Sequence, residues 1–282
     1  MGITDRMIAK WIAGGADITP RPVNQHALDS LLAKAAPDAR RRFIQATMGL
    51  ASIVYDDSDT ALIGTAGEHT LRRHRIDGRL MALIEQGVYL AGADNRPEWL
   101  SAYWIDVYPV TNADYFRFTA ATGHPAPPHW SRGRYPDLLA DHPVVFVTWH
   151  DAAAYATWAD KQLPTAQQWE KAARGGKGAA FPWGDQETPF KCNVRESRVR
   201  STTPVDRYHS GVSSYGVYDL CGNIWEWCST ASGADRRELK GSAFTSAFAR
   251  ALPSAFNDAN VEMADDDTGF RCATATDADL IS

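Results

Sequence analysis

The stretch best suited to chemistry covers residues 208–228 and reads YHSGVSSYGVYDLCGNIWEWC. It places the side chains of Asp219, Asn223 and Glu226 among closely spaced tyrosines and tryptophans. Burial of these aromatic rings would remove a large apolar area from water, whereas a buried carboxylate costs free energy unless it is paired or binds a metal. The residue types are therefore compatible with two structures, a packed aromatic turn or a cation site with oxygen ligands.

The rest of the chain changes in character near residue 80, which predicts two parts. Residues 1–79 carry apolar residues at helical spacing and are expected to form a helical N-terminal segment. Residues 80–282 are expected to form one α+β domain of short strands, turns and helices. Within it, a strand or hairpin is expected at 81–92, and little regular structure is expected between Trp183 and the last residues.

Three segments of this domain are expected to carry a helix, at 103–123, 142–164 and 164–176. The first two combine an apolar strand-like stretch with helical spacing. In the first, the chain is expected to turn at Pro109 into a helix capped by Asn112. The third helix is expected to end at the glycine pair that begins with Gly175.

Composition restricts the partners and the location. With 29 lysines and arginines against 34 aspartates and glutamates, the formal net charge is −5 at pH 7, which lacks the basic excess of a nucleic-acid-binding protein. No apolar run is long enough to cross a bilayer, so no membrane contact is expected. The first residues lack the apolar core and cleavage site of a signal peptide, so a cytoplasmic location is expected.

The chain has four cysteines, Cys192, Cys221, Cys228 and Cys272. Their number and spacing form neither a disulfide framework for a chain of this size nor a zinc ribbon. They are expected to be mostly buried small apolar residues, and pairing of one of them remains open.

Eight stretches between Met81 and Thr274 resemble the formylglycine-generating enzyme (sulfatase-modifying factor) family. They occur in that family's order and read MALIEQGVYLAG, YPVTNADYFRF, HPVVFVTWHDAAAYATWA, LPTAQQWEKAARGG, FPWGD, TTPVDRY, YGVYDLCGNIWEWC and TGFRCA. The resemblance implies a compact, irregular α+β fold related to the C-type lectin fold. It also implies a core held by short strands, aromatic packing and bound calcium.

The resemblance places two calcium sites on this chain. The first would use two carboxylates and two backbone carbonyls, from Asp219, Glu226, Gly222 and Ile224. The second would use the side chain of Asn193 and the carbonyl of Val194. Such oxygen donors are the ligands that calcium binds in proteins. The alternative is that the carboxylates are satisfied by backbone N–H groups or by an arginine such as Arg198 or Arg207.

Catalytic members of this family oxidise a substrate cysteine to formylglycine with copper(I) held by two cysteines, and thiolates are the ligands that this soft ion selects. The corresponding interval of this chain, 240–271, contains no cysteine. Ser246 and Ala251 stand approximately where the two copper cysteines would be, and neither side chain can hold copper(I). Formylglycine-generating activity is therefore not expected.

The function expected is that of a calcium-stabilised domain that binds a peptide or a small molecule. The ligand is expected to bind near Ser246, Trp130 and Trp149. Residues 1–79 are expected to pack on the domain or to contact a protein partner.

Two alternatives follow from other relatives of the same fold. The first is a metal-dependent oxidoreductase of altered chemistry, holding copper or a non-haem iron bound by histidines such as His26, His69 and His74, although the HxxxHxE motif of iron-dependent relatives is missing from this chain. The second is a variable protein of a diversity-generating retroelement, which would display its ligand-binding surface over residues 243–267.

Overall fold

The computed structural model describes residues 70–275, 277 and 279–281, which form two main sheets, a separate hairpin and three helices. The five-stranded sheet has the order β10-β5-β2-β1-β11, with every neighbouring pair antiparallel. Its strands are β1 (Leu71–His74), β2 (Leu80–Ile84), β5 (Tyr103–Asp106), β10 (Ala273–Thr274) and β11 (Leu280–Ile281). All four residues of β5 are buried, so the centre of this sheet lies in the core.

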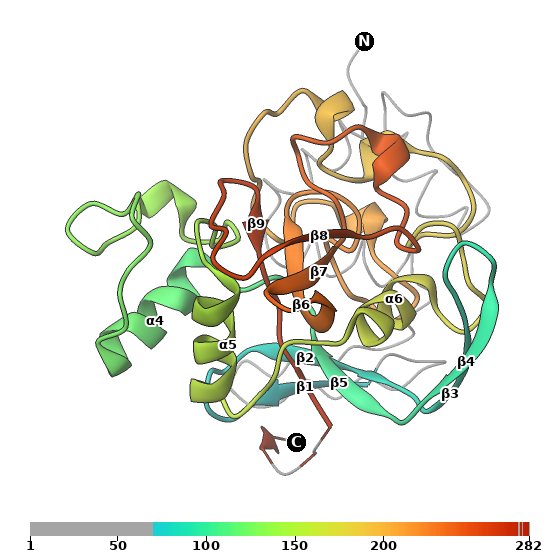
Figure 1. Ribbon diagram of the computed structural model, residues 1–282, viewed down its shortest axis with the longest axis horizontal. Helices are drawn as coiled ribbons and strands as arrows, with labels where there is room; N and C mark the ends of the chain where they lie inside the picture. Colours follow the sequence, from blue (N-terminus) through green and yellow to red (C-terminus); the bar gives the residue numbers. More distant parts are fainter. Residues whose placement is uncertain (1–69, 276, 278, 282) are drawn as a thin grey trace, which may run out of the picture.

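The four-stranded sheet has the order β8-β7-β6-β9 and carries part of the 208–228 stretch. Its strands are β6 (Trp225–Gly233), β7 (Arg236–Lys240), β8 (Asn257–Asn260) and β9 (Thr268–Gly269). Strand β6 pairs antiparallel with β7 and parallel with the short β9. The remaining two strands, β3 (Gly87–Ala91) and β4 (Arg96–Leu100), form a hairpin that lies at the opposite side of the molecule from α4 and α5 (Figure 1).

The three α-helices each begin at a threonine that forms a capping box. They are α4 (Asn112–Thr122), α5 (Trp149–Trp158) and α6 (Ala166–Arg174). The hydroxyls of Thr111, Thr148 and Thr165 accept hydrogen bonds from the backbone N–H of the third helical residue, whose side chain returns the bond. Within the described residues, five single turns of 3₁₀ helix occur in the connections, η2 (Asp137–Leu139), η3 (Pro189–Lys191), η4 (Arg195–Ser197), η5 (His209–Gly211) and η6 (Phe248–Arg250).

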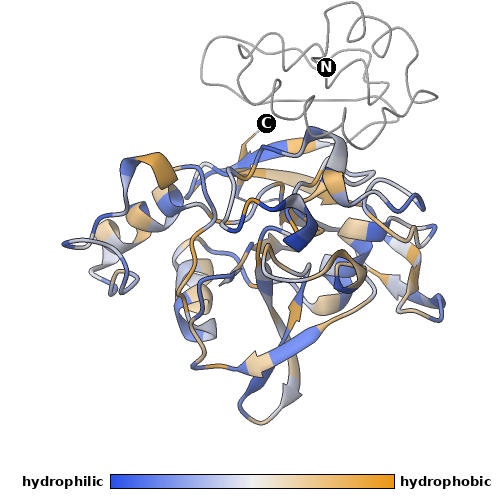
Figure 2. Cartoon of the chain, turned by 90° about the horizontal axis from the view of Figure 1, so that it is seen from above, coloured by the Kyte–Doolittle hydropathy of each residue, from blue (hydrophilic) through white to orange (hydrophobic). Residues whose placement is uncertain are grey.

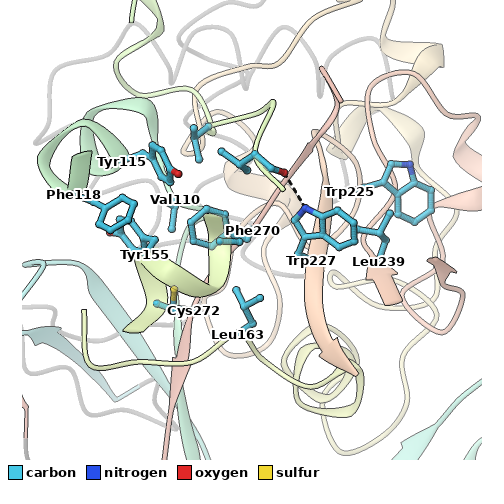
Figure 3. Close-up of a cluster of buried hydrophobic side chains, with 14 of the residues drawn as sticks. Val110, Tyr115, Phe118, Tyr155, Leu163, Trp225, Trp227, Leu239, Phe270 and Cys272 are labelled. Carbon is cyan, nitrogen blue, oxygen red and sulfur yellow. Dashed lines mark hydrogen bonds between the residues drawn. The ribbon is translucent and has the colours of Figure 1, made fainter. Parts of the chain in front are cut away.

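The largest core cluster joins α4 and α5 to strand β6 (Figure 3). In it the rings of Tyr115 and Tyr155 stack at 6.0 Å, and Phe270 meets Tyr155 edge-on at 5.3 Å. The buried indole of Trp227 donates a hydrogen bond to the Val147 carbonyl at 3.1 Å, drawn as the dashed line in Figure 3. Figure 2 shows that apolar and hydrophilic residues both occur along the helices and strands.

A second cluster lies between α6 and the five-stranded sheet and is built around the fully buried Trp169. A third, smaller cluster contains Phe181, Val194 and Ala251 together with the cysteines Cys192 and Cys221. The described part of the chain therefore has three clusters of buried side chains, and the third contains two of the four cysteines.

The expected helices are confirmed at α4, α5 and α6, and α6 ends at Gly175 as expected. The cap of α4 differs, because Thr111 is the N-cap and Asn112 is the first helical residue. The Asn112 amide instead donates to the carbonyls of Leu139 and His142, at 2.9 and 3.1 Å, and so ties down the loop that precedes α5.

Other expectations differ from the structure. The 81–92 segment forms two strands, but β2 pairs with β1 and β5 while β3 pairs with β4, so the two do not form a hairpin together. Regular structure continues beyond Trp183 as the β6–β7 hairpin, whose charged second strand, RRELK, gives no apolar alternation to detect.

The expected N-terminal helices lie almost entirely outside the described residues. The exception is Leu71–His74, which forms strand β1 rather than a helix and pairs with both β2 and β11. This segment is a strand because it pairs with the following strand β2 and with β11 near the end of the chain, rather than because of its own sequence. Among the helices of the described residues, none is both long and apolar enough to cross a membrane.

Candidate functional site

The turn between Tyr218 and Trp225 has an unusual backbone. Asp219, Gly222 and Asn223 all have left-handed φ angles, of 54°, 80° and 67°. Gly222 forms a parallel bridge with Asn193, and a Cβ atom at position 222 would lie only 2.5 Å from the Asn193 carbonyl oxygen. Only glycine permits both this φ angle and this close approach. The turn therefore brings the two predicted calcium ligand sets side by side.

Asn223 holds the turn together and is itself fully buried. Its amide nitrogen donates to the Asp219 carboxylate at 2.7 Å and to the Thr203 carbonyl at 3.1 Å. Its amide oxygen accepts from the Thr203 backbone N–H at 2.9 Å and from the Asn193 amide at 3.1 Å. Asn223 thus fixes the orientation of Asp219 and the position of the Asn193 segment.

Asp219 is a buried carboxyl group with little neutralising charge around it. Burial raises its pKa to about 8, although the hydrogen bond from Asn223 and the positive charge of Arg271 act in the opposite direction. The negative charge of Glu226 adds to the increase. Such a group gains stability either by keeping its proton or by meeting a cation.

Glu226 lies on strand β6 and already has a cationic partner. Its carboxylate is fully buried and accepts bonds from the Arg271 guanidinium, at 2.6 Å from Nε to Oε2 and 2.7 Å from Nη2 to Oε1. The indole of Trp169 donates to the same carboxylate at 2.9 Å. The remaining guanidinium donors reach the carbonyls of Asp106, Val107 and Tyr218. The prediction that an arginine satisfies a carboxylate here is thus met by Arg271, not by Arg198 or Arg207.

The turn offers oxygen donors, which are the type of ligand that a hard cation such as calcium binds. Asp219 supplies a carboxylate, and the carbonyls of Gly222 and Ile224 supply the oxygen atoms that calcium accepts. The Gly222 carbonyl also accepts the Ile224 N–H at 3.0 Å, which leaves one of its two lone pairs available. Across the described residues, no group of three or more His, Cys, Asp or Glu side chains could hold a metal ion, so a cation here depends on backbone oxygens.

The second predicted set consists of groups that already have protein partners. The Asn193 side-chain oxygen accepts the Ser197 hydroxyl at 2.9 Å, and the Val194 carbonyl accepts the Ser197 N–H at 2.9 Å. Asn193 also donates to the Ser201 carbonyl at 2.8 Å. These bonds fold the segment after Asn193 into a turn that packs against Gly222. Both calcium ligand sets remain predictions.

The three predicted ligand-binding residues differ in exposure. Trp130 is 6 % exposed and packs in the core, with Tyr115 and Tyr135 against its ring. Trp149 is half-buried, donates from its indole to the Cys228 carbonyl at 3.0 Å and lies under the Arg237 guanidinium. Of the two tryptophans, only Trp149 therefore has enough accessible surface to contact a ligand.

Ser246 lies in a different part of the domain. Its backbone N–H donates to the Ala243 carbonyl at 3.0 Å, and its carbonyl accepts the Arg195 N–H at 2.9 Å. The nearby 3₁₀ turn η6 places Arg250 over the ring of Trp225 at 5.7 Å. The bonds of Ser246 thus join it to the segment after Asn193.

All four cysteines are buried and unpaired, as expected of small apolar residues. Burial raises the pKa of Cys228 and Cys272 well above the usual value of a thiol. Ala251, which stands approximately where a copper cysteine would be, is fully buried, and its carbonyl accepts a hydrogen bond from the Cys221 thiol at 3.2 Å.

Of the histidines proposed for an iron site, His26 and His69 lie outside the described residues. His74 is fully buried at the end of β1, with its Nδ1 3.2 Å from the Asp77 carboxylate. Asp77 also accepts a bond from Lys161 at 2.7 Å, and Lys161 bonds to Asp106 at 2.9 Å. His74 therefore belongs to a buried ion-pair network beside the five-stranded sheet.

Sequence reasoning missed the roles of Arg271 and Trp169. Both lie in stretches that were recognised, TGFRCA and LPTAQQWEKAARGG, but neither was assigned a partner. An arginine between Phe270 and Cys272 is a signal that could have been used, because an arginine in an apolar run is rarely buried unless it is paired.

Comparison with known proteins identifies the family. Residues 68–276 match the model of the sulfatase-modifying factor enzyme 1-like domain. The chain is 38% identical over 152 residues to an inactive C-alpha-formylglycine-generating enzyme 2 from Bos taurus, covering 48% of this chain and 50% of that protein. It is 35% identical over 190 residues to a formylglycine-generating enzyme from Thermomonospora curvata, covering 48% of this chain and 62% of that enzyme.

The fold is also found in a solved structure. PvdO from Pseudomonas aeruginosa superposes with a TM-score of 0.60 at 18% identity, covering 73% of this chain and 97% of that chain. The chain spans about half the length of the curated relatives that head the sequence comparison. Since the family model matches well over half of the chain, the protein belongs to the sulfatase-modifying factor enzyme 1-like family, with the formylglycine-generating-enzyme fold that its sequence resembles.

Proposed function

We propose that this protein is a binding member of its family, one that holds a peptide or small molecule without converting cysteine to formylglycine. The observation that carries the proposal is the absence of cysteine from residues 240–271, with Ser246 and Ala251 where the resemblance expects the two copper ligands. A hydroxyl and a methyl group cannot replace two thiolates for copper(I).

The surroundings of Ala251 support this proposal. Its side chain is fully buried in the third core cluster, beside Phe181 and Cys221. A residue in this position contributes to packing and offers no polar atom from its side chain. The similarity to an inactive family member from Bos taurus is consistent with this proposal and extends over about half of each chain.

We further propose that calcium stabilises the turn that carries Asp219, with the carbonyls of Gly222 and Ile224 as further ligands. The bound ion would supply the positive charge that the Asp219 carboxylate lacks. Glu226 would serve mainly as the partner of Arg271, because each of its oxygens already accepts a guanidinium bond. Asn223 lies between Gly222 and Ile224 in the chain, and its amide donates a hydrogen bond that orients the Asp219 carboxylate.

The proposed ligand surface is centred on Trp149, because Ser246 is buried and bonded to the segment after Asn193. Trp149 offers a partly exposed ring beside Arg237, a combination that suits a planar or negatively charged group. Trp130 would support this surface from the core rather than touch the ligand, because it is buried against Tyr115 and Tyr135.

The decisive experiment supplies the purified protein with copper(I), oxygen and a peptide containing a CxPxR motif, and measures aldehyde formation by mass spectrometry. The formylglycine-generating enzyme from Thermomonospora curvata serves as the positive control. We expect aldehyde from the control enzyme and none from this protein. Aldehyde formed by this protein with multiple turnovers would overturn the proposal.

A further inference from the structure

Two of the four buried cysteines meet in the third core cluster. Cys192 and Cys221 directly precede Asn193 and Gly222, the two residues of the parallel bridge. Bridged segments lie about 4.8 Å apart, which is within the range of Cα separations that a disulfide spans. The two side chains also belong to the same cluster of buried residues.

Each of the two thiols has a backbone carbonyl as its hydrogen-bond partner. The Cys221 thiol reaches the Ala251 carbonyl at 3.2 Å, and the Cys192 thiol reaches the Pro189 carbonyl at 3.5 Å. Both side chains are 2 % exposed and share the cluster with Phe181, so each is confined to a small apolar space.

The other two cysteines have different surroundings. The Cys228 thiol lies near the Glu226 carbonyl, at 3.8 Å. Cys272 lies in the largest core cluster and donates its backbone N–H to the Asp106 carboxylate at 3.0 Å. Cys228 is grouped with the second cluster, so these two cysteines provide natural controls for the first pair.

We propose that Cys192 and Cys221 form a reversible disulfide that crosslinks the Asn193 segment to the Asp219–Asn223 turn. The two thiols lose two protons and two electrons as the Sγ–Sγ bond forms. A low-molecular-weight disulfide such as oxidised glutathione accepts them by thiol–disulfide exchange and leaves as two thiol molecules.

The crosslink has a mechanical consequence for the turn. It closes a loop of about 30 residues and so restricts the unfolded chain. In the folded protein it lies one residue from each partner of the Asn193–Gly222 bridge. Oxidation therefore stabilises the part of the domain that carries Asp219 and Asn223.

The test uses the full chain, purified in the reduced state and then equilibrated in buffers with increasing ratios of oxidised to reduced glutathione. A second sample is refolded from denaturant in the same buffers, so that burial does not block the exchange. Free thiols are trapped by alkylation in denaturant, and the chain is cut with trypsin and chymotrypsin, which separates Cys221 from Cys228. Mass spectrometry then identifies the crosslinked peptides.

We expect a crosslinked peptide pair containing Cys192 and Cys221 in most chains at the oxidising end of the series. The midpoint of thermal unfolding should rise by about 5–10 °C on oxidation. The same rise should occur in Cys228→Ser and disappear in Cys192→Ala and Cys221→Ala.

Two results would overturn the proposal. One is full alkylation of both cysteines in every buffer, in the refolded as well as the native sample. The other is a crosslink that joins either of them to Cys228 or Cys272 instead. Because the peptide map is made on the unaltered chain, neither result depends on whether the variants fold.

Discussion

The guanidinium of Arg271 donates hydrogen bonds to both carboxylate oxygens of Glu226, although the two residues are 45 positions apart in the chain. The pair is fully buried and joins strand β6 to the segment that follows β9. Its guanidinium also bonds to three backbone carbonyls, so a single side chain links the five-stranded sheet, the Asp219 turn and β6.

Replacing Arg271 by leucine should strongly destabilise the domain. The substitution leaves the Glu226 carboxylate buried without a counter-charge, and removing one partner of such a pair costs about 3–5 kcal/mol. Urea unfolding of the wild type and the variant measures the loss. A matched control is Arg236→Leu, whose ion pair with Asp258 is exposed and should matter far less. Equal effects of the two substitutions would contradict the role given to Arg271.

Replacing Gly222 by alanine should distort the turn. The new Cβ would meet the Asn193 carbonyl oxygen at 2.5 Å and the residue would keep a φ of 80°. Left-handed strain and overpacking together should cost about 2–5 kcal/mol. The control is Gly123→Ala, which has a similar φ of 74° but nothing within 4 Å of the added atom. Urea unfolding should show that position 222 is the more sensitive, and the opposite order would refute the close approach.

Asp77 should make the domain less stable in acid. Burial alone would raise the pKa of the Asp77 carboxyl, but the His74 ring, with its Nδ1 at 3.2 Å, and the charges of Lys161 and Arg79 hold this pKa well below its usual value. Between the ordinary value and the lowered one, the unfolded chain binds the additional proton, so falling pH favours unfolding. The stabilisation is complete above about pH 4 and should be lost progressively below it.

The measurement is urea unfolding as a function of pH, for the wild type and Asp77→Asn. We expect the variant to be less stable at pH 7 and to lose less stability between about pH 4 and pH 2. Identical slopes for the two proteins would show that Asp77 does not carry this pH dependence.

The proposed calcium at the turn should appear as a ligand-dependent rise in stability. An ion that binds only the folded state adds about 2.7 kcal/mol at a free concentration one hundred times its Kd. Chelation should therefore lower the unfolding midpoint of the wild type and leave Asp219→Asn almost unchanged. The control Glu262→Gln removes an exposed carboxylate and should keep the full response. A chelator response that survives in Asp219→Asn would place the calcium elsewhere.

The helices could be predicted because their signals are local. Thr148 and Asp151, and likewise Thr165 and Gln168, form capping boxes within four residues of sequence. The position of the candidate turn could also be predicted, since its carboxylates and aromatic rings are adjacent in the chain.

The partners of these residues could not be predicted in the same way. Arg271 and Glu226 are brought together by the pairing of β6 with β9, and Cys192 and Cys221 by the bridge between Asn193 and Gly222. Strand β7 shows the same limit, because its charged residues adopt a strand by pairing with β6 and β8 rather than by intrinsic preference.

The most direct test of the whole account is the metal content of the full chain, purified without chelator or affinity metal and measured by mass spectrometry of the elements. The account predicts calcium at about one per chain, lost in Asp219→Asn, with copper and iron far below stoichiometry. Copper or iron at about one per chain, with oxygen consumed when a substrate peptide is added, would contradict it and identify the protein as an oxidase with a rebuilt site.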